Sequence, residues 1–197
     1  MAEPVTRLAS CEIDSVLADE PGLLRRAQEG DRQAFAVLVE RYWNPLYRWL
    51  YHLSHDRHTA EDLAQDALLK AFAAIASFKP GTNFRAWLFR IAYNRFVNLH
   101  HVQVRRKQVF PDDLPASGQQ PIDEILSRET MQLLARTLGR LPSHFRAAFL
   151  LRAEQGLSFR EISRIMETTE ETARWRVFKA RQKLMEALAP YLGQETS

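Results

Sequence analysis

The stretch Ser158–Leu188, SFREISRIMETTEETARWRVFKARQKLMEAL, decides the fold of the C-terminal part of this chain. Ser158 followed by Glu161 forms a capping box, which predicts a short helix that ends at Met166. A longer helix is predicted to begin near Thr169 and to run to about Leu188. A short helix, a tight turn and a longer helix are the proportions of a helix-turn-helix motif.

The longer helix is predicted to have two different faces. Ala173, Val177, Ala180 and Leu184 recur at helical spacing and are expected to face the core. A second stripe of the helix carries cations and large aromatics, which are residues that bind DNA. Cations can contact phosphates, arginine can form two hydrogen bonds with a guanine edge, and an aromatic ring can pack on a thymine methyl group. That stripe consists of Glu171, Arg174, Trp175, Phe178, Lys179 and Gln182, with Arg176, Arg181 and Lys183 beside it as expected phosphate contacts. An alternative stays open, in which Trp175 and Phe178 pack on a neighbouring helix.

Composition places the chain among globular proteins rich in regular structure. Its 197 residues carry 27 basic and 24 acidic side chains, with 46% apolar residues and only 7 glycines and 9 prolines. The single cysteine, Cys11, excludes an intrachain disulfide. Apolar runs are far shorter than the ~20 residues of a membrane helix, and the acidic first twenty residues have no apolar signal core. We therefore expect a cytoplasmic protein without membrane insertion.

Charge divides the chain into segments. The segments Arg85–Lys107 and Thr172–Lys183 contain basic residues and no acidic ones. In Pro111–Glu129, by contrast, every charged residue except Arg128 is acidic. Three prolines and a glycine within Phe110–Pro121 predict a linker. The expected organisation is an N-terminal extension (1–20), a helical domain (21–107), a linker (108–121), a second helical domain (122–190) and a tail (191–197). We hypothesise that Asp112, Asp113, Asp123 and Glu124 screen the two basic segments in the free protein.

The remaining segments also have helical periodicity. Apolar residues recur from Phe35 to Leu53 after the N-cap Asp31, and Pro45 is expected to bend or interrupt this helix. Thr59–Asp62 is predicted to open the next helix, and Pro80-Gly81 forces a turn before a helix from Phe84 to about Val104. Further helices are predicted over Ile122–Leu138 and Ser143–Glu154. No segment alternates as a strand, so the fold class is all-α, with two small helical domains joined by a flexible linker.

A second candidate DNA surface lies on the helix that follows Phe84. Amides beside cations suit hydrogen bonds to base edges together with neutralisation of phosphates. The residues predicted on this outer face are Asn94, Arg95, Asn98, His101 and Arg105. In the preceding loop, Lys79 and Asn83 stand next to Phe78 and Phe84, where an unstacked base could be received. A plain turn is the alternative for this loop.

An acidic group at the start of one helix is the third candidate. Asp62, Gln65 and Asp66 fall on one exposed face beside apolar residues, which is typical of a protein-docking surface, although acids in a first turn also suit the helix dipole. His55-Asp56 is similar to the motif of metal-dependent hydrolases, but a metal site needs ligands that converge from several helices. No phosphate loop or nucleophile motif is present, so no catalytic residue, metal or cofactor is expected.

These segments together resemble a known family. Ala60–Phe72, Ser77-Phe78 and Phe84–Asn94, with its Trp87, Leu88, Ile91 and Ala92, resemble region 2 of the extracytoplasmic-function sigma factors of the sigma-70 family (group IV). Leu141–Arg152, Gly156–Ile162 and Thr172–Leu184 resemble region 4 of the same family. The resemblance covers about Leu23–Leu188, in the family's order and with a linker in the expected place.

The resemblance implies a transcription initiation subunit that binds core RNA polymerase, through its β′ clamp helices and β flap, and directs it to promoter DNA. It places Asp62, Gln65 and Asp66 at the clamp helices. It places the Ser77–Asn83 loop, Asn94, Arg95 and Asn98 at the −10 element, and Arg174, Trp175, Phe178 and Lys179 at the −35 element. It further implies control by an anti-sigma factor and no enzymatic activity of the chain itself.

Some residues depart from the family pattern. The turn has Glu167, Thr168 and Thr169 where the family usually has glycine, an apolar residue and serine, and Trp175 stands where a small residue is usual. The −35 sequence is therefore expected to be unusual. A free-standing helix-turn-helix regulator that binds duplex DNA without polymerase stays open as an alternative, and co-purification with core polymerase separates the two.

Overall fold

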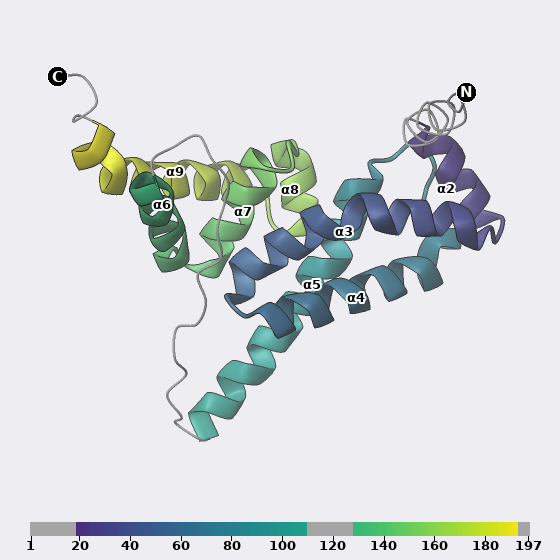
Figure 1. Ribbon diagram of the computed structural model, residues 1–197, viewed down its shortest axis with the longest axis horizontal. Helices are drawn as coiled ribbons and strands as arrows, with labels where there is room; N and C mark the ends of the chain where they lie inside the picture. The colour runs from purple at the N-terminus through teal and green to yellow at the C-terminus, as the bar shows by residue number, and fades with distance from the viewer. Residues whose placement is uncertain (1–18, 110–127, 193–197) are drawn as a thin grey trace, which may run out of the picture.

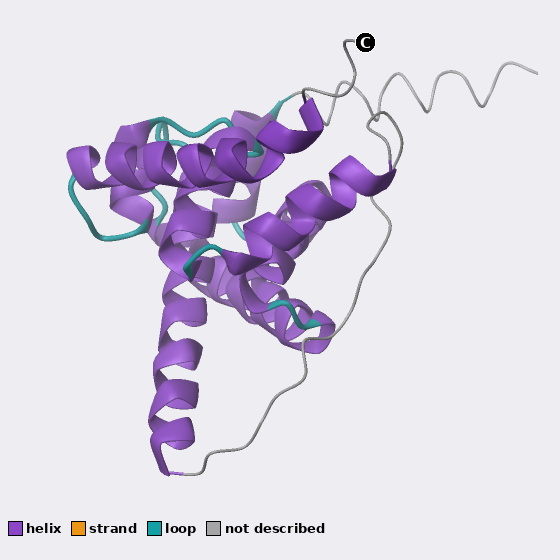
Figure 2. Ribbon diagram, turned by 90° about the vertical axis from the view of Figure 1, so that its left-hand side faces the viewer, coloured by secondary structure: helices purple, strands orange, loops and turns teal. Residues whose placement is uncertain are grey.

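The protein, as a computed structural model, is described at residues 19–109 and 128–192, and within these ranges it contains helices and loops but no strand (Figures 1 and 2). The first range contains α2 (Glu20–Gln28), α3 (Arg32–Ser54), α4 (Arg57–Ala74), a 3₁₀ turn (Ile75–Ser77) and α5 (Phe84–Val109). The second contains α6 (Arg128–Arg140), α7 (Ser143–Ala153), α8 (Phe159–Ile165) and α9 (Glu170–Leu192). The all-α prediction is confirmed. The acidic residues Asp112, Asp113, Asp123 and Glu124 lie outside the described ranges.

Side-chain caps fix where several helices begin. The Asp31 carboxylate accepts hydrogen bonds from the backbone N–H groups of Gln33 (2.9 Å) and Ala34 (3.1 Å) and so caps α3. Ser158 and Glu161 form the predicted capping box of α8. The predicted start of α4 at Thr59 was wrong, because Asp56 is the N-cap and accepts a hydrogen bond from the Thr59 N–H at 2.7 Å.

Pro45 was expected to bend or interrupt this helix; α3 passes through it as one helix, so the interruption was wrong, whereas the bend stays a prediction. A proline inside a helix removes one backbone hydrogen bond and crowds the preceding turn. Tyr42, Leu46 and Trp49 lie on both sides of Pro45 in sequence, and each is at most 2% exposed. We attribute the continuity of α3 to this packing, because burial of large apolar side chains stabilises more than one hydrogen bond does.

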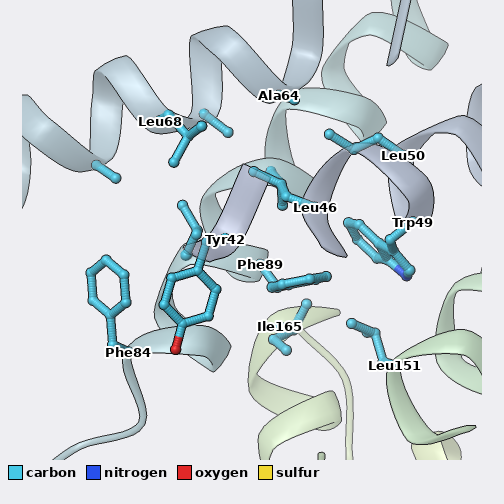
Figure 3. Close-up of a cluster of buried hydrophobic side chains, with 14 of the residues drawn as sticks. Tyr42, Leu46, Trp49, Leu50, Ala64, Leu68, Phe84, Phe89, Leu151 and Ile165 are labelled. Carbon is cyan, nitrogen blue, oxygen red and sulfur yellow. The ribbon is translucent and has the colours of Figure 1, made fainter. Parts of the chain in front are cut away.

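The helices before and after the linker share one hydrophobic core, which no local pattern in the sequence indicates. A continuous cluster of buried residues runs from Leu23 on α2 to Ala173 on α9. Figure 3 shows Leu151 of α7 and Ile165 of α8 beside Trp49 of α3 and Phe89 of α5. The Trp49 and Phe89 rings pack with centroids 5.1 Å apart. The two helical units are therefore in direct apolar contact.

A smaller cluster lies between α6 and α9, where Leu138 and Leu141 pack against Ala180 and Leu184. It attaches the inner face of α9 to the rest of the second unit, as its apolar spacing predicted. The C-terminal part of α5 projects beyond the other helices (Figures 1 and 2). No helix in the described ranges combines the length and apolar character needed to cross a membrane.

Arg146 on α7 is a buried polar link between the two units, with only 5% of its surface exposed. Its guanidinium donates hydrogen bonds to the carbonyls of Gly139 (2.8 Å) and Leu138 (3.2 Å) at the end of α6. It also donates to the carbonyl of Leu53 on α3 at 3.1 Å. Burial lowers the pKa of Arg146 to about 10, so the group stays charged at neutral pH. One cation thus satisfies the carbonyl ends of two helices from different units.

Candidate nucleic-acid and protein interfaces

The outer face of α9 has the mixture of aromatics and cations that the sequence predicted. Ala173 and Ala180 are fully buried and Val177 packs on the core, so the opposite side faces solvent. Trp175 is 50% exposed and Phe178 is 62% exposed. Large aromatics left in water on a globular protein are typical of an interaction surface. Arg174 is exposed beside them, and Lys179 is half-buried.

Neighbouring residues hold this stripe in place. The Arg174 guanidinium lies 5.0 Å from the ring centroid of Phe159 on α8 and 3.5 Å from the carboxylate of Glu170. Trp175 packs against Phe145 of α7 with ring centroids 5.4 Å apart. The alternative interpretation is therefore correct in part for Trp175, which uses one side of its ring for packing, whereas Phe178 is more open to solvent.

The two predicted flanking arginines have different surroundings. Arg181 is exposed on α9. Arg176 is half-buried, and its charge lowers the pKa of His144 on α7, after the larger effect of burial. The same charge acts on Tyr93 of α5, so Arg176 lies toward the junction of the two units. Of the pair, Arg181 is the one that is open to solvent beside the stripe.

The turn between α8 and α9 contains the departure noted in the sequence. Glu167 has a φ of 49°, a left-handed conformation that residues other than glycine, asparagine and aspartate seldom adopt. The Thr168 N–H donates to the Ser163 carbonyl at 2.9 Å, and the Thr169 hydroxyl accepts from the Thr172 N–H at 3.1 Å and so caps α9. The turn is closed without glycine, and the carboxylate of Glu167 points toward α5.

The predicted DNA face of α5 is in contact with the second unit. The Asn94 side-chain amide and the Arg90 guanidinium each lie 3.4 Å from a Glu167 carboxylate oxygen. The Asn83 amide donates to Glu161 of α8 at 2.7 Å. Lys79 and Asn98 are exposed. His101 and Arg105 lie on the projecting part of α5, outside the residues whose side chains the structure describes.

The two phenylalanines beside the loop that precedes α5 are buried. Phe78 is 3% exposed and Phe84 is 1% exposed, and their rings pack edge to face with centroids 5.4 Å apart. Both also contact Trp87 of α5. A buried ring cannot stack on an incoming base. In this loop, the polar side chains of Lys79 and Asn83 are the groups that solvent can reach.

The predicted docking face of α4 is only partly free. Asp62 and Gln65 are exposed. Asp66 is half-buried and forms an ion pair with Arg95 of α5, one of the predicted DNA residues. Asp66 and Arg95, assigned to two different partners from the sequence, therefore contact each other.

Beside this face lies an apolar groove between α3 and α4 that the sequence analysis missed. Leu69 is 68% exposed and Phe72 is 42% exposed, whereas Leu68 of the same helix is buried. The groove is lined by Arg32, Phe35, Val39, Trp43, Gln65, Leu68, Leu69 and Phe72. Apolar side chains at i and i+3 signal one helical face, but they do not tell whether that face meets this chain or another one.

A polar cluster closes the junction between α3 and α7. His55 Nε2 lies 2.6 Å from an Arg146 guanidinium nitrogen, so this ring nitrogen accepts the hydrogen bond. Burial and the nearby charges of Arg48 and Arg146 lower the pKa of His52 to about 4. Its Nε2 lies 3.9 Å from a Glu154 carboxylate oxygen, and burial raises the pKa of Glu154. Because His52 is neutral at neutral pH, this contact is not an ion pair.

The hydrolase interpretation of His55-Asp56 gains no support from this arrangement. His55 faces a guanidinium, and Asp56 caps α4. Among the described residues, no three histidine, cysteine or acidic side chains come together in a way that could hold a metal ion.

Comparisons with known proteins find the same family in both units. The family model described as Sigma-70 region 2 matches residues 38–108, and that described as Sigma-70, region 4 matches residues 131–184. The RNA polymerase sigma-H factor of Pseudomonas aeruginosa is 33% identical over 183 residues, which span 86% of this chain and 94% of that protein. The ECF RNA polymerase sigma-E factor of Haemophilus influenzae is 31% identical, with 88% of this chain and 97% of the relative covered.

Solved structures give a similar result. The sigma factor RpoE of Bartonella quintana, in complex with the anti-sigma factor NepR, superposes with a TM-score of 0.71 at 30% identity, covering 79% of this chain and 96% of that chain. CnrH, in complex with the cytosolic domain of CnrY, superposes with a TM-score of 0.63 at 26% identity, covering 87% and 97%.

Proposed function

This chain belongs to the extracytoplasmic-function sigma factors, and from that premise we propose how its surfaces select a promoter and open it. As a member of the family, the chain is a transcription initiation factor that binds core RNA polymerase and directs it to promoter DNA. Polymerase supplies the chemistry, and this chain contributes no catalytic group of its own. We place its action in the cytoplasm.

We propose that α9 reads the −35 element from the major groove. The observation that carries this proposal is the stripe formed by the exposed Arg174, Trp175 and Phe178 with the half-buried Lys179, opposite the buried Ala173 and Ala180. The Arg174 guanidinium can donate two hydrogen bonds to a guanine edge, and the Phe178 ring can contact a thymine methyl group. Lys179, Arg181 and the half-buried Arg176 supply positive charge for phosphates.

The −10 element is assigned to α5 and the loop before it. Lys79, Asn83, Asn94, Arg95 and Asn98 offer amide and cationic donors, and His101 and Arg105 extend the same helix. Melted promoter DNA exposes base edges and phosphates that such donors recognise. Because Phe78 and Phe84 are buried, bases cannot stack on their rings. We therefore assign the capture of melted DNA to hydrogen bonds and to positive charge.

Polymerase docking is assigned to α4 and the adjoining groove. Asp62 and Gln65 provide polar contacts, and Leu69 and Phe72 provide apolar area that is exposed in the free chain. An apolar groove with a polar rim suits a helix from a partner. We also assign Asp66 to this face, because it is half-buried and part of its side chain stays open to solvent although it pairs with Arg95. We further infer that an anti-sigma factor controls the chain, since the similar sigma factor RpoE of Bartonella quintana is solved in complex with the anti-sigma factor NepR.

Runoff transcription with core polymerase on a promoter library tests this function. We expect transcripts from a subset of promoters that share an upstream element, and we expect the Arg174→Ala variant to change which promoters are used. Co-purification of the chain with core polymerase is the second expected result. A chain that binds duplex DNA but neither associates with core polymerase nor yields transcripts would instead be a free-standing regulator.

A further inference from the structure

α8 of the second unit lies on the face of α5 that we assign to the −10 element. Its Glu161 carboxylate accepts a hydrogen bond from the Asn83 amide at 2.7 Å. The Glu167 carboxylate, at the turn after α8, lies 3.4 Å from the Asn94 amide and 3.4 Å from the Arg90 guanidinium. Two of the donors proposed to capture DNA, Asn83 and Asn94, therefore already have anionic partners from the same chain, and so does the neighbouring Arg90.

We propose that this contact is autoinhibitory: in the closed chain, the carboxylates of Glu161 and Glu167 occupy the place of DNA on α5, and DNA binds there only after the two units separate. The inference rests on the proposed function for one point, the assignment of Asn83 and Asn94 to DNA. It adds that the free chain regulates its own access to DNA.

Carboxylates are chemically suited to this role. A carboxylate oxygen accepts the same hydrogen bonds from amides and guanidinium groups that phosphate and base oxygens accept. Two negative charges on this face also repel the DNA backbone and cancel the attraction of Arg90. Phosphate groups and these glutamates therefore compete for the same positive surface.

Apolar packing keeps the closed arrangement in place. Leu151 and Ile165 of the second unit are at most 1% exposed and belong to the same core as Trp49 and Phe89 (Figure 3). Arg146 adds hydrogen bonds that reach Leu53 on α3. Separation of the units exposes this apolar surface to water, so the open form is a minor state of the free chain. The apparent affinity for DNA then falls by the fraction of molecules that are open.

A charge-neutralising pair tests the role of the two carboxylates in the full chain. Glu161→Gln with Glu167→Gln keeps the side-chain length, and glutamine is compatible with the capping box at Glu161. The matched control is Glu40→Gln with Glu186→Gln, on α3 and α9, which makes the same change in net charge outside the α5–α8 contact. Because both pairs alter net charge equally, non-specific attraction to DNA changes equally.

The probe is a short mixed-sequence single-stranded DNA, and its affinity is measured by fluorescence anisotropy without polymerase. We expect the contact pair to bind about 3- to 10-fold more tightly than the control pair, because the exposed ion pair between Arg90 and Glu167 contributes up to about a factor of five and the amide contacts of Asn83 and Asn94 also weaken when their acceptors lose charge. Equal affinities of the two pairs would overturn the proposal.

A covalent lock provides the opposite test. His52 Nε2 and Glu154 Oε1 lie 3.9 Å apart across the α3–α7 junction and belong to neither proposed DNA surface. In a Cys11→Ser background, His52→Cys with Glu154→Cys can be joined by a short bis-maleimide, which holds the units closed. We expect the joined chain to bind the probe at least tenfold more weakly than the same variant before joining. Unchanged affinity would overturn the proposal.

The two assays separate this inference from the proposed function. Failure of the unjoined variant to support transcription with core polymerase counts against the function, whereas probe binding controlled by the lock still supports autoinhibition. Transcription by both the joined and the unjoined forms at equal rates supports the function and overturns the autoinhibition.

Discussion

Asp66 on α4 and Arg95 on α5 form an ion pair that joins the proposed polymerase face to the proposed −10 face. The two side chains are 36% and 37% exposed, so solvent screens their attraction only in part. Asp66 must break this ion pair before it can bind polymerase, and Arg95 must break it before it can bind DNA. The pair therefore links two surfaces that the sequence alone presents as separate.

We expect Asp66→Ala to weaken association with core polymerase and to lower the free energy of unfolding by about 0.5–1 kcal/mol, the range of a partly exposed ion pair. A double-mutant cycle with Arg95→Ala, measured by urea denaturation, isolates the pairwise contribution. Asp62→Ala, at an exposed position on the same face, is the control for the loss of a carboxylate. A loss of several kcal/mol in Asp66→Ala alone would identify a structural residue.

Arg174→Ala is expected to lose about 1–3 kcal/mol of binding free energy on its preferred −35 sequence and to relax the preference at one base pair. The physical reason is the loss of two hydrogen bonds to a base edge. Binding to a set of duplexes with single base changes measures this effect. Arg181→Ala, assigned to a phosphate, should weaken binding to every duplex by a similar factor. Equal losses across all sequences in Arg174→Ala would assign it to the backbone as well.

The two exposed aromatics of α9 should behave differently when truncated. Phe178 is 62% exposed, so Phe178→Ala should change stability by less than about 0.5 kcal/mol while it weakens −35 binding. Trp175 packs on Phe145, so Trp175→Ala should also destabilise the fold, by about 1–2 kcal/mol. Thermal denaturation and DNA binding, measured on both variants, test this division. Equal stability losses in the two variants would contradict it.

Acid should destabilise the closed chain through His52. Burial, followed by the charges of Arg48 and Arg146, lowers the pKa of His52 in the folded state to about 4, below its ordinary value, so the unfolded chain takes up the proton first. Stability should therefore fall as the pH decreases from about 6.5 toward 4, by about 3 kcal/mol in total for this group. The raised pKa of Glu154 opposes part of this fall.

His52→Gln should flatten the pH dependence of the denaturation midpoint in this range, because it removes the titrating ring and keeps a polar side chain at the junction. The measurement is urea denaturation at a series of pH values. A slope as steep as that of the unaltered chain would show that a different group is responsible.

Local signals in the sequence predicted most of the helices but not how they pack together. Asp31 and the Ser158 capping box are short-range features, and both were identified correctly. The start of α4 was misplaced because Thr59 and Asp56 are both good capping residues, and the sequence does not show that α3 ends in a left-handed turn at His55, directly before the cap Asp56. Pro45 lies inside a continuous α3 because tertiary packing outweighs its local cost.

The sequence predicted the residues of the candidate surfaces where helical spacing sets them, but not the contacts between distant segments. The stripe on α9 follows from helical spacing, since its inner residues identify its outer ones. Contacts such as Asp66–Arg95 and Asn94–Glu167 join residues far apart in the chain, and no local pattern encodes them. The exposure of Leu69 and Phe72 was missed because an apolar residue in a helical pattern is usually buried.

The two-faced construction of α9 has a consequence for how such chains diversify. Ala173, Ala180 and Leu184 keep the helix seated, while Arg174, Phe178 and Lys179 lie on the side away from the core. With α9 as the proposed reader of the −35 element, a duplicated gene can accumulate changes at the outer positions and acquire a new set of target genes while the protein still folds.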